Sequence, residues 1–256
     1  MKVLITGGAG FIGSHLADKL IEMGCQVSII DNLSTGKLEN INPAVYHWNE
    51  DLNKIPIEDL ISYLKGVKYV FHLAAKTSVE ESIHNPALYL NHNLHGMTKL
   101  LSACAKSGVK RFIFSSSSSV YGEATVVPTP ETISTNPLSP YALSKLQGEK
   151  LCKLYSNVYN LDTVSLRYFN AYGERMNEEG SYKLVIPIFA KLIKQGKPCT
   201  IVNDGEQKRD FVYVKDIVNA NIRAATNQAD LFGGVFNIGS GKNYSVNELA
   251  DAMGGE

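Results

Sequence analysis

The sequence has 256 residues, of which 44% are apolar and 20% charged, a composition typical of a folded globular protein. Its 25 Lys and Arg residues balance its 25 Asp and Glu residues, which removes the electrostatic attraction on which nucleic-acid binding depends. No stretch approaches the ~20 apolar residues of a membrane span, and the apolar run at the N-terminus is too short for a signal peptide. We therefore expect a cytoplasmic protein with no nucleic-acid or membrane partner.

The four cysteines lie far apart and form no CxxC pair: Cys25, Cys104, Cys152 and Cys199. This spacing does not match a metal site, and a disulfide framework is not expected in a chain of this length. We expect free thiols and no bound metal.

Apolar, β-branched runs alternate with longer helical patterns through the first part of the chain. The expected strands are Lys2–Thr6, Gln26–Ile30, Lys68–Leu73, Arg111–Phe114 and Thr163–Leu166. The expected helices are Phe11–Met23, which Gly24 ends, Ile83–Lys106 and Ser139–Tyr159. This alternation predicts an α/β fold in which a doubly wound parallel sheet is covered by helices on both faces.

The pattern changes after about Tyr168. Strand signals become sparse there, and helical patterns recur at Leu184–Lys194 and Lys215–Thr226 between polar loops at Asn177–Lys183 and Asn203–Asp210. We therefore expect a nucleotide-binding domain over residues 1–168. Residues 169–256 would form a smaller lobe, interleaved with the sheet and closing a ligand crevice over its carboxyl edge.

A glycine-rich turn, Thr6-Gly7-Gly8-Ala9-Gly10-Phe11-Ile12-Gly13, follows the first expected strand and opens the first expected helix. Gly7 would permit the tight reversal, Gly10 would let the backbone approach a pyrophosphate, and Gly13 would allow close packing of helix and strand. The motif alone also fits a plain tight turn. Asp31, which follows the second strand, favours a dinucleotide, because an acid there accepts hydrogen bonds from ribose hydroxyls. It would repel a 2′-phosphate, which favours NAD over NADP.

A second motif joins a tyrosine and a lysine on one helix. Ser139 suits the cap and Pro140 the first position of that helix, which places Tyr141 and Lys145 on the same face. A nearby ammonium lowers the pKa of a phenol and makes it a workable base. Such a pair alone is more often a solvated helix face. The serine run Ser115–Ser119 adds hydroxyls at the carboxyl end of an expected strand, where ligands bind.

Taken together, these motifs resemble the extended short-chain dehydrogenase/reductases, and among them the UDP-hexose 4-epimerases. The matching stretches are Thr6–Gly13, Asp31–Gly36, His72–Ala75, Phe114–Gly122, Pro140–Lys145, Leu166–Gly173 and Arg209–Tyr213. The resemblance implies a Rossmann-type sheet and an NAD cofactor. It also implies a homodimer in which Ile83–Lys106 and Tyr141–Tyr159 pair with their copies as a four-helix bundle.

The resemblance further implies roles for individual residues. Those expected around NAD are Gly7, Gly10, Phe11, Ile12, Gly13, Asp31, Asn32, Ser34, Thr35, Gly36, Asp51, Leu52, Leu73, Ala74, Ala75, Lys76, Asn93, Ser115, Tyr141, Lys145 and Tyr168. Tyr141 matches the family's catalytic base, Lys145 its partner and Ser117 the catalytic hydroxyl. The residues expected to contact the sugar nucleotide are Ser117, Ser118, Asn170 and Arg209, the last at the diphosphate. The helix opened by Leu184–Pro187 resembles the family's lid over the nucleotide.

The implied activity is reversible inversion at C4 of a UDP-hexose through a 4-keto intermediate. Ser118 and Ser119 stand where related dehydratases carry an acidic pair, and related decarboxylases carry a glutamate at the second of these positions. Both activities are therefore disfavoured, since dehydration needs an acid to protonate the leaving hydroxyl. Ser118 also favours tolerance of an N-acetylated sugar.

Relatives continue past the position of Glu256 with a segment that completes the sugar pocket. We therefore expect an incomplete lobe, which is naturally short, truncated or completed by another chain. Two alternatives to the 4-epimerase stay open. One is a different NAD-dependent sugar-nucleotide epimerase or reductase, and the other is a non-catalytic protein that binds NAD or a nucleotide.

Overall fold

A seven-stranded parallel sheet forms the centre of the protein, whose computed structural model describes residues 1–124, 126–176 and 185–254. The strands lie in the order β10-β6-β5-β4-β1-β2-β3, which is the order of a Rossmann-type doubly wound sheet. Their bounds are β1 Lys2–Thr6, β2 Gln26–Ile30, β3 Tyr46–Trp48, β4 Val67–His72, β5 Arg111–Ser117, β6 Asp162–Tyr168 and β10 Gly234–Ile238. The predicted fold class is confirmed.

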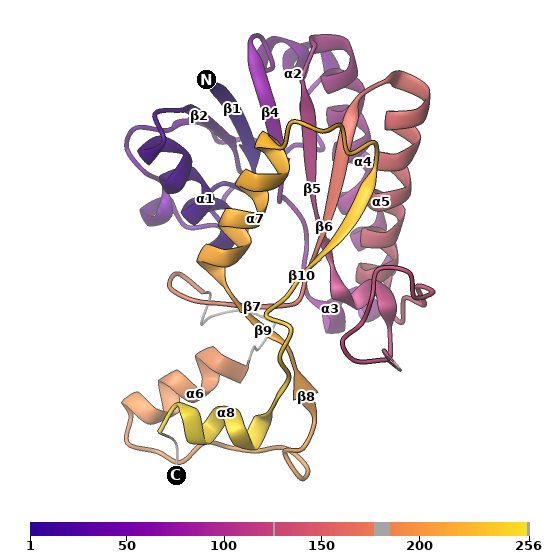
Figure 1. The fold of residues 1–256 in the computed structure, drawn as a ribbon. Helices are drawn as coiled ribbons and strands as arrows, with labels where there is room; N and C mark the ends of the chain where they lie inside the picture. The colour runs from indigo at the N-terminus through magenta and orange to yellow at the C-terminus, as the bar shows by residue number, and fades with distance from the viewer. Residues whose placement is uncertain (125, 177–184, 255–256) are drawn as a thin grey trace.

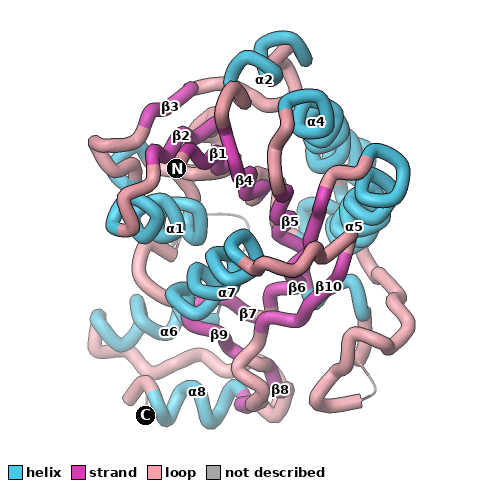
Figure 2. Tube along the Cα trace, turned by 45° about the horizontal axis from the view of Figure 1, so that its top comes forward, coloured by secondary structure: helices cyan, strands magenta, loops and turns pink. Residues whose placement is uncertain are grey.

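Helices cover both faces of this sheet (Figures 1 and 2). One face carries α1 (Phe11–Glu22) and α7 (Val214–Thr226). The other carries α2 (Ile57–Tyr63), α4 (Pro86–Ser107) and α5 (Pro140–Tyr159). Each face has its own apolar core, so the central strands are buried on both sides. This explains the apolar runs of β1 and β4, whereas β5 and β6 also bury polar residues such as Arg111 and Asp162, which pair with each other.

Successive strands are added to the sheet in one direction from β1 and in the opposite direction from β4. These two strands are parallel, hydrogen-bonded neighbours. From β1 the chain passes to β2 on one side, while the later strands build outward from β4 on the other. The loops leaving the carboxyl ends of β1 and β4 therefore diverge and leave a crevice between them, where ligands of such sheets bind.

Local signals in the sequence set the ends of two functional helices. Gly24 follows α1 with a φ of +76°, a left-handed conformation that glycine adopts without strain. The Ser139 side chain accepts a hydrogen bond of 3.1 Å from the Ala142 amide and caps α5, whose first residue is Pro140. Both predicted helix ends are confirmed.

A smaller lobe lies beneath the carboxyl edge of the sheet (Figure 1). It contains α6 (Val185–Lys194), α8 (Val246–Ala252) and two short strand pairs. The paired strands are β7 (Asn170–Tyr172) with β9 (Phe211–Tyr213), and β8 (Lys208–Arg209) with β11 (Tyr244–Ser245). However, α7 and β10 also come after residue 168 and belong to the layers of the sheet. A single boundary at residue 168 therefore does not follow those layers, and the division into 1–168 and 169–256 stays a prediction.

Several elements differ from the expected ones. The strand expected at Arg111–Phe114 continues to Ser117, because β6 pairs with it over its whole length. The helix expected at Ile83–Lys106 is two helices, α3 (Val79–His84) and α4, which meet at Asn85. We did not predict β3, α2 or β10, which are short or lie where polar residues interrupt the pattern. Leu184 and the loop Asn177–Lys183 lie outside the described residues. Within the described residues, no helix is both long and apolar enough to cross a membrane.

Candidate active site

Two cavities open at the carboxyl edge of the sheet. The first, of about 360 Å³, lies between the ends of β1 and β4, and we call it the switch-point cavity. The second, of about 900 Å³, lies between the sheet edge and the smaller lobe, and we call it the lobe cavity. They share six lining residues: Phe11, Ile12, Thr77, Ser116, Tyr141 and Tyr168. Ligands that filled both cavities would therefore lie next to each other beside Tyr141.

The glycine turn forms one wall of the switch-point cavity. Gly7 has a φ of +74°, and a Cβ there would lie 2.7 Å from the Ala74 amide nitrogen, so this glycine permits both the reversal and the close approach of the next loop. A Cβ on Gly13 would lie 2.2 Å from the Gly7 carbonyl oxygen. The close packing expected at Gly13 is therefore within the turn itself rather than against the strand.

Gly10 differs from these two, because a Cβ there would meet only the Gly7 carbonyl, at 3.3 Å, and would otherwise occupy the cavity. Gly10 is also the N-cap of α1, and no side chain in the described residues caps this helix end. The first amides of the helix are therefore free to bind an anion, which the helix dipole also favours. These features fit a dinucleotide whose pyrophosphate lies against the turn.

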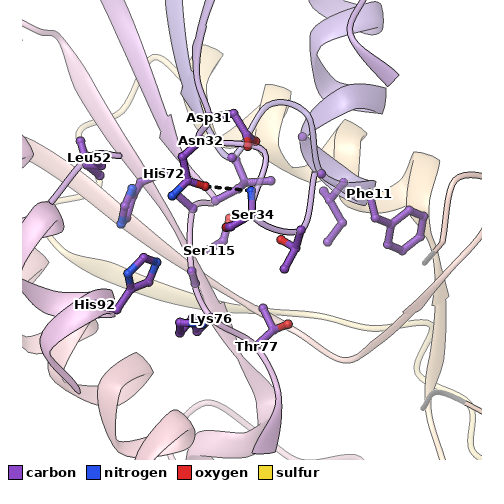
Figure 3. Close-up of a pocket in the computed structure, with 18 of the residues that line it drawn as sticks. Phe11, Asp31, Asn32, Ser34, Leu52, His72, Lys76, Thr77, His92 and Ser115 are labelled. Carbon is purple, nitrogen blue, oxygen red and sulfur yellow. Dashed lines mark hydrogen bonds between the residues drawn. The ribbon is translucent and has the colours of Figure 1, made fainter. Parts of the chain in front are cut away.

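Asp31 lies at the end of β2 and is 8% exposed. One carboxylate oxygen accepts the Ala9 amide at 2.9 Å and the other accepts the Leu33 amide at 2.8 Å. The carboxylate is thus fixed in orientation, and each oxygen keeps a lone pair that can accept a hydrogen bond from a hydroxyl group. Figure 3 shows Asp31 beside Asn32 and Ser34 at one end of the cavity. This geometry fits an adenosine ribose with free hydroxyls.

Most of the residues expected around NAD line the switch-point cavity. They are Gly7, Gly10, Phe11, Ile12, Gly13, Asp31, Asn32, Ser34, Thr35, Asp51, Leu52, Leu73, Ala74, Ala75, Lys76, Ser115, Tyr141, Lys145 and Tyr168.

Two of the expected residues, Gly36 and Asn93, do not line it. Gly36 instead packs against Ala9, whose Cβ would lie 2.8 Å from a Cβ at Gly36. Asn93 accepts the Lys76 amide at 2.8 Å and donates to the Lys76 carbonyl at 3.0 Å, which fixes the loop after β4 from behind. Both residues shape the wall without forming it.

Of the three residues expected to be catalytic, Tyr141 is part of the shared wall and the other two lie in the cavities on either side of it. Tyr141 lines both cavities, Ser117 lines the lobe cavity, and Lys145 lines the switch-point cavity. The Lys145 Nζ lies 5.9 Å from the centroid of the Tyr141 ring and donates to the Ser115 carbonyl at 2.7 Å. The Ser117 hydroxyl accepts the Ser119 amide at 3.2 Å, which leaves its own proton free to be donated.

Burial shifts the pKa values of Lys145 and Tyr168, which line the switch-point cavity together with Tyr141. Desolvation lowers the pKa of Lys145 from 10.5 to about 8, so the side chain is still mainly a cation at pH 7. Desolvation raises the pKa of Tyr168 to about 12, and its hydroxyl lies 3.0 Å from both the Ser115 and the Asn221 side-chain oxygens. Tyr168 therefore stays a neutral phenol. Of the two tyrosines on the shared wall, Tyr141 is the one next to a cation.

The residues expected to contact a sugar nucleotide all line the lobe cavity: Ser117, Ser118, Asn170 and Arg209. Asn170 is held by its side chain, which donates to the Asp210 carbonyl at 2.9 Å. Arg209 is exposed, and its Nη1 donates to the Lys208 carbonyl at 2.8 Å, so the remaining guanidinium donors can reach an anion in the cavity.

Sequence reasoning missed several residues of both walls. In the switch-point cavity they include Glu50, Asn53, Thr77, Tyr89 and His92. In the lobe cavity they include Tyr121, Glu123, Val127, Lys208, Asn237 and Asn243. Asp210 also went unnoticed, although its carboxylate accepts hydrogen bonds from Ser240 and Gly241 and so holds the loop that closes the lobe cavity. Most of them lie outside the motifs recognised in the sequence, and their positions in the walls depend on partners distant in the chain.

Within the described residues, no three His, Cys, Asp or Glu side chains are grouped so as to hold a metal ion. The four cysteines lie singly, as free thiols.

A family model for the NAD dependent epimerase/dehydratase family matches residues 3–239. The chain is 43% identical to the UDP-N-acetylglucosamine 4-epimerase of Methanobrevibacter ruminantium, solved with UDP-N-acetylmuramic acid. That comparison has a TM-score of 0.92 and covers 99% of this chain and 82% of the other. It is 40% identical to the Thermotoga maritima UDP-glucose 4-epimerase solved with UDP-glucose, at a TM-score of 0.92 over 100% and 84% of the two chains. A UDP-glucose 4-epimerase of Mycolicibacterium smegmatis is 37% identical over 100% of this chain and 82% of its own.

Proposed function

This chain belongs to the NAD dependent epimerase/dehydratase family and is an NAD-dependent epimerase, and we propose that it inverts C4 of a UDP-hexose through a 4-keto intermediate. The observation that carries the proposal is the wall shared by the two cavities. Tyr141 lies on this wall beside the Lys145 cation, where a cofactor in one cavity would meet a substrate in the other. Bound NAD would supply the acceptor that takes hydride from C4 and later returns it to the opposite face of the carbon.

Residues of this chain would remove and return the proton of the 4-hydroxyl. Tyr141 as a phenolate would accept it, because the buried Lys145 cation favours the charged phenolate over the neutral phenol. Ser117, whose hydroxyl proton is free, would donate to the same sugar oxygen and hold it near Tyr141. When the hydride returns, Tyr141 would give the proton back.

Inversion also requires the keto sugar to present its other face while the nucleotide stays bound. Arg209 and Asn170 would hold the diphosphate and the neighbouring nucleotide at the lobe. The lobe cavity, of about 900 Å³, leaves room for the sugar to turn about its link to the diphosphate.

We propose UDP-glucose and UDP-galactose, with their N-acetylated forms also accepted. The two solved relatives act on UDP-glucose and on UDP-N-acetylglucosamine, and both are similar to this chain. Ser118, a small polar residue on the wall of the lobe cavity, supports room for an N-acetyl group.

A coupled assay tests this proposal. Purified protein with added NAD is incubated with UDP-glucose and, separately, with UDP-N-acetylglucosamine, and each product is resolved by NMR. The expected result is the C4 epimer of at least one substrate, with no net consumption of NAD. Binding of NAD without any product would favour a non-catalytic nucleotide-binding protein, and stoichiometric use of NADH by a keto sugar would favour a reductase.

We also propose that the protein is a cytoplasmic homodimer joined through α4 and α5. Large apolar side chains of these helices are exposed, among them Leu88 at 47%, Leu154 at 48% and Val158 at 61%. A second copy of the same helices would cover them. Light scattering at micromolar concentration should give the mass of two chains, and cell fractionation should recover the protein without membranes. A monomeric mass would contradict the dimer.

A further inference from the structure

His92 lies on α4 and contributes to the wall of the switch-point cavity, although nothing in the glycine turn or the catalytic motifs points to it. In Figure 3 its ring stands clear of its helix, drawn between Lys76 and His72. The side chain is half-buried. A neutral imidazole donates a hydrogen bond from one ring nitrogen and accepts at the other, so the contacts it can make depend on which nitrogen carries the proton.

The side chain of Asn53 indicates which ring nitrogen of His92 carries the proton, because the orientation of the Asn53 amide is itself fixed. Its Oδ1 accepts the Gly96 amide at 2.9 Å, and a main-chain amide can only donate. The side-chain NH₂ therefore points the other way. Two oxygens confirm this orientation, since the Nδ2 lies 3.2 Å from the His92 carbonyl and 3.3 Å from an Asp51 carboxylate oxygen.

The same NH₂ lies 3.2 Å from the Nδ1 of His92. A hydrogen on Nδ1 would point at this donor group, so the contact favours an Nδ1 without a proton, with the two NH₂ hydrogens shared among three acceptors. The neutral ring must then carry its proton on Nε2. Within the described part of the chain, no protein group accepts a hydrogen bond from this Nε2, so its donor is available to a ligand in the cavity.

Burial also favours the neutral form. It lowers the pKa of His92 against the opposing effect of the Asp51 carboxylate, which raises it, and the Lys76 cation adds a smaller lowering. A second proton would have to go on Nδ1, where it would face the Asn53 NH₂. His92 is therefore a neutral donor held in one tautomer.

We propose that His92 is a cofactor-binding residue, whose Nε2–H donates to the dinucleotide, and that Asn53 is the positioning residue that fixes this tautomer. The inference rests on the NAD part of the proposed function and not on the identity of the sugar. It adds a specific polar contact to a wall that also includes the glycine turn, Asp31 and the polar residues Asn32, Ser34 and Thr35.

The tautomer can be observed directly. NMR of ¹⁵N-labelled protein correlates each ring nitrogen with the ring protons, and a nitrogen that carries hydrogen resonates far from one that does not. At pH 7 we expect His92 to show hydrogen on Nε2 and none on Nδ1. In Asn53→Leu, where the donor is gone, the two tautomers should mix. A His92 that carries hydrogen on Nδ1 in the unsubstituted protein would overturn the proposal.

Binding of NAD to nucleotide-free protein, measured by calorimetry, tests the contact itself. His92→Asn keeps an acceptor for Asn53 but loses the donor into the cavity, and should weaken NAD binding about tenfold. His92→Gln can place an amide donor where Nε2 stands, and should bind within about threefold of the unsubstituted protein. His95→Asn is the matched control, because His95 is exposed on the same helix and does not line the cavity. It should leave binding unchanged.

The outcomes separate this inference from the proposed function. Equal NAD affinity in His92→Asn and the unsubstituted protein would overturn the inference even if the protein epimerises UDP-glucose. Equal losses in His92→Asn and His92→Gln would also overturn it, since they would indicate a packing effect rather than a hydrogen bond. Conversely, a tenfold loss in His92→Asn alone would support it even if no sugar nucleotide is converted.

Discussion

The Lys145 ammonium donates a hydrogen bond of 2.7 Å to the Ser115 main-chain carbonyl. This bond holds the cation at the carboxyl end of β5, next to Ser116 of the shared wall and 5.9 Å from the centre of the Tyr141 ring. Because Lys145 is buried, its charge is poorly screened and acts strongly on its neighbours. The helix α5 supplies both side chains, and the sheet supplies the carbonyl that fixes one of them.

Replacing Tyr141 by Phe removes the proposed base and leaves the ring. We expect kcat to fall by about 10²–10⁴-fold, the usual contribution of general acid–base catalysis. NAD affinity should change little, since the wall keeps its shape. Steady-state rates and calorimetry on the same preparation would check both. A kcat within about threefold of the unsubstituted enzyme would exclude Tyr141 as the base.

Replacing Lys145 by Met should change how stability depends on pH. The folded pKa of about 8 lies below the ordinary 10.5, so the unfolded chain binds more protons between these values and stability rises with pH there. The cost of burying the charge is fully present below pH 8. We expect Lys145→Met to be more stable than the unsubstituted protein at pH 7, on the order of 2 kcal/mol, and the gap to close towards pH 10. Urea unfolding across this range measures it, and a gap independent of pH would contradict the assignment.

His72 should make the protein sensitive to acid. Burial first, and the Lys145 charge second, lower its pKa from 6.5 to about 3. The unfolded chain therefore binds more protons between these values, and stability falls as the pH drops below 6.5. His72→Asn should lose about 2 kcal/mol less than the unsubstituted protein between pH 7 and pH 4.5. Exposed His95→Asn serves as control, and equal acid sensitivity in all three proteins would refute the prediction.

Alanine substitutions at two glycines with nearly the same backbone conformation distinguish the cost of backbone strain from the cost of steric crowding. Gly7 and Gly24 have φ values of +74° and +76°, but only a Cβ at Gly7 would meet other atoms, the nearest at 2.7 Å. Gly24→Ala should cost about 1 kcal/mol of unfolding free energy from strain alone. Gly7→Ala should cost about 2–4 kcal/mol and also weaken NAD binding. Thermal unfolding of both variants measures the difference, which should vanish if the loop after β4 can move away freely.

The sequence predicted those parts of the fold that depend on neighbouring residues. The apolar run of β1, the glycine turn, and the cap formed by Ser139 and Pro140 are all local, and each has the expected structure. The positions of the candidate catalytic residues follow from these elements, because strand ends and helix starts meet at one edge of a parallel sheet.

The rest depends on pairs that are distant in the sequence. Arg111 binds Asp162 and the carbonyls of Ala224 and Ala229, and so fixes the end of α7 against the sheet, a contact that no motif indicates. The roles of Gly36 and Asn93 were inferred from resemblance, but the structure places both behind the wall. His92 lies within a predicted helix, but the protonation of its ring nitrogens follows from a contact with Asn53, which lies in a distant loop.

Conversion of UDP-glucose that carries deuterium at C4 tests the central claim most directly. If C4 is oxidised and reduced within the closed site, the hydrogen leaves and returns without meeting water. NMR of the product formed in ordinary water should then show UDP-galactose with deuterium still at C4. A product that has exchanged its deuterium for solvent hydrogen would contradict the account, as would the absence of a C4 epimer from both UDP-glucose and UDP-N-acetylglucosamine while NAD is bound.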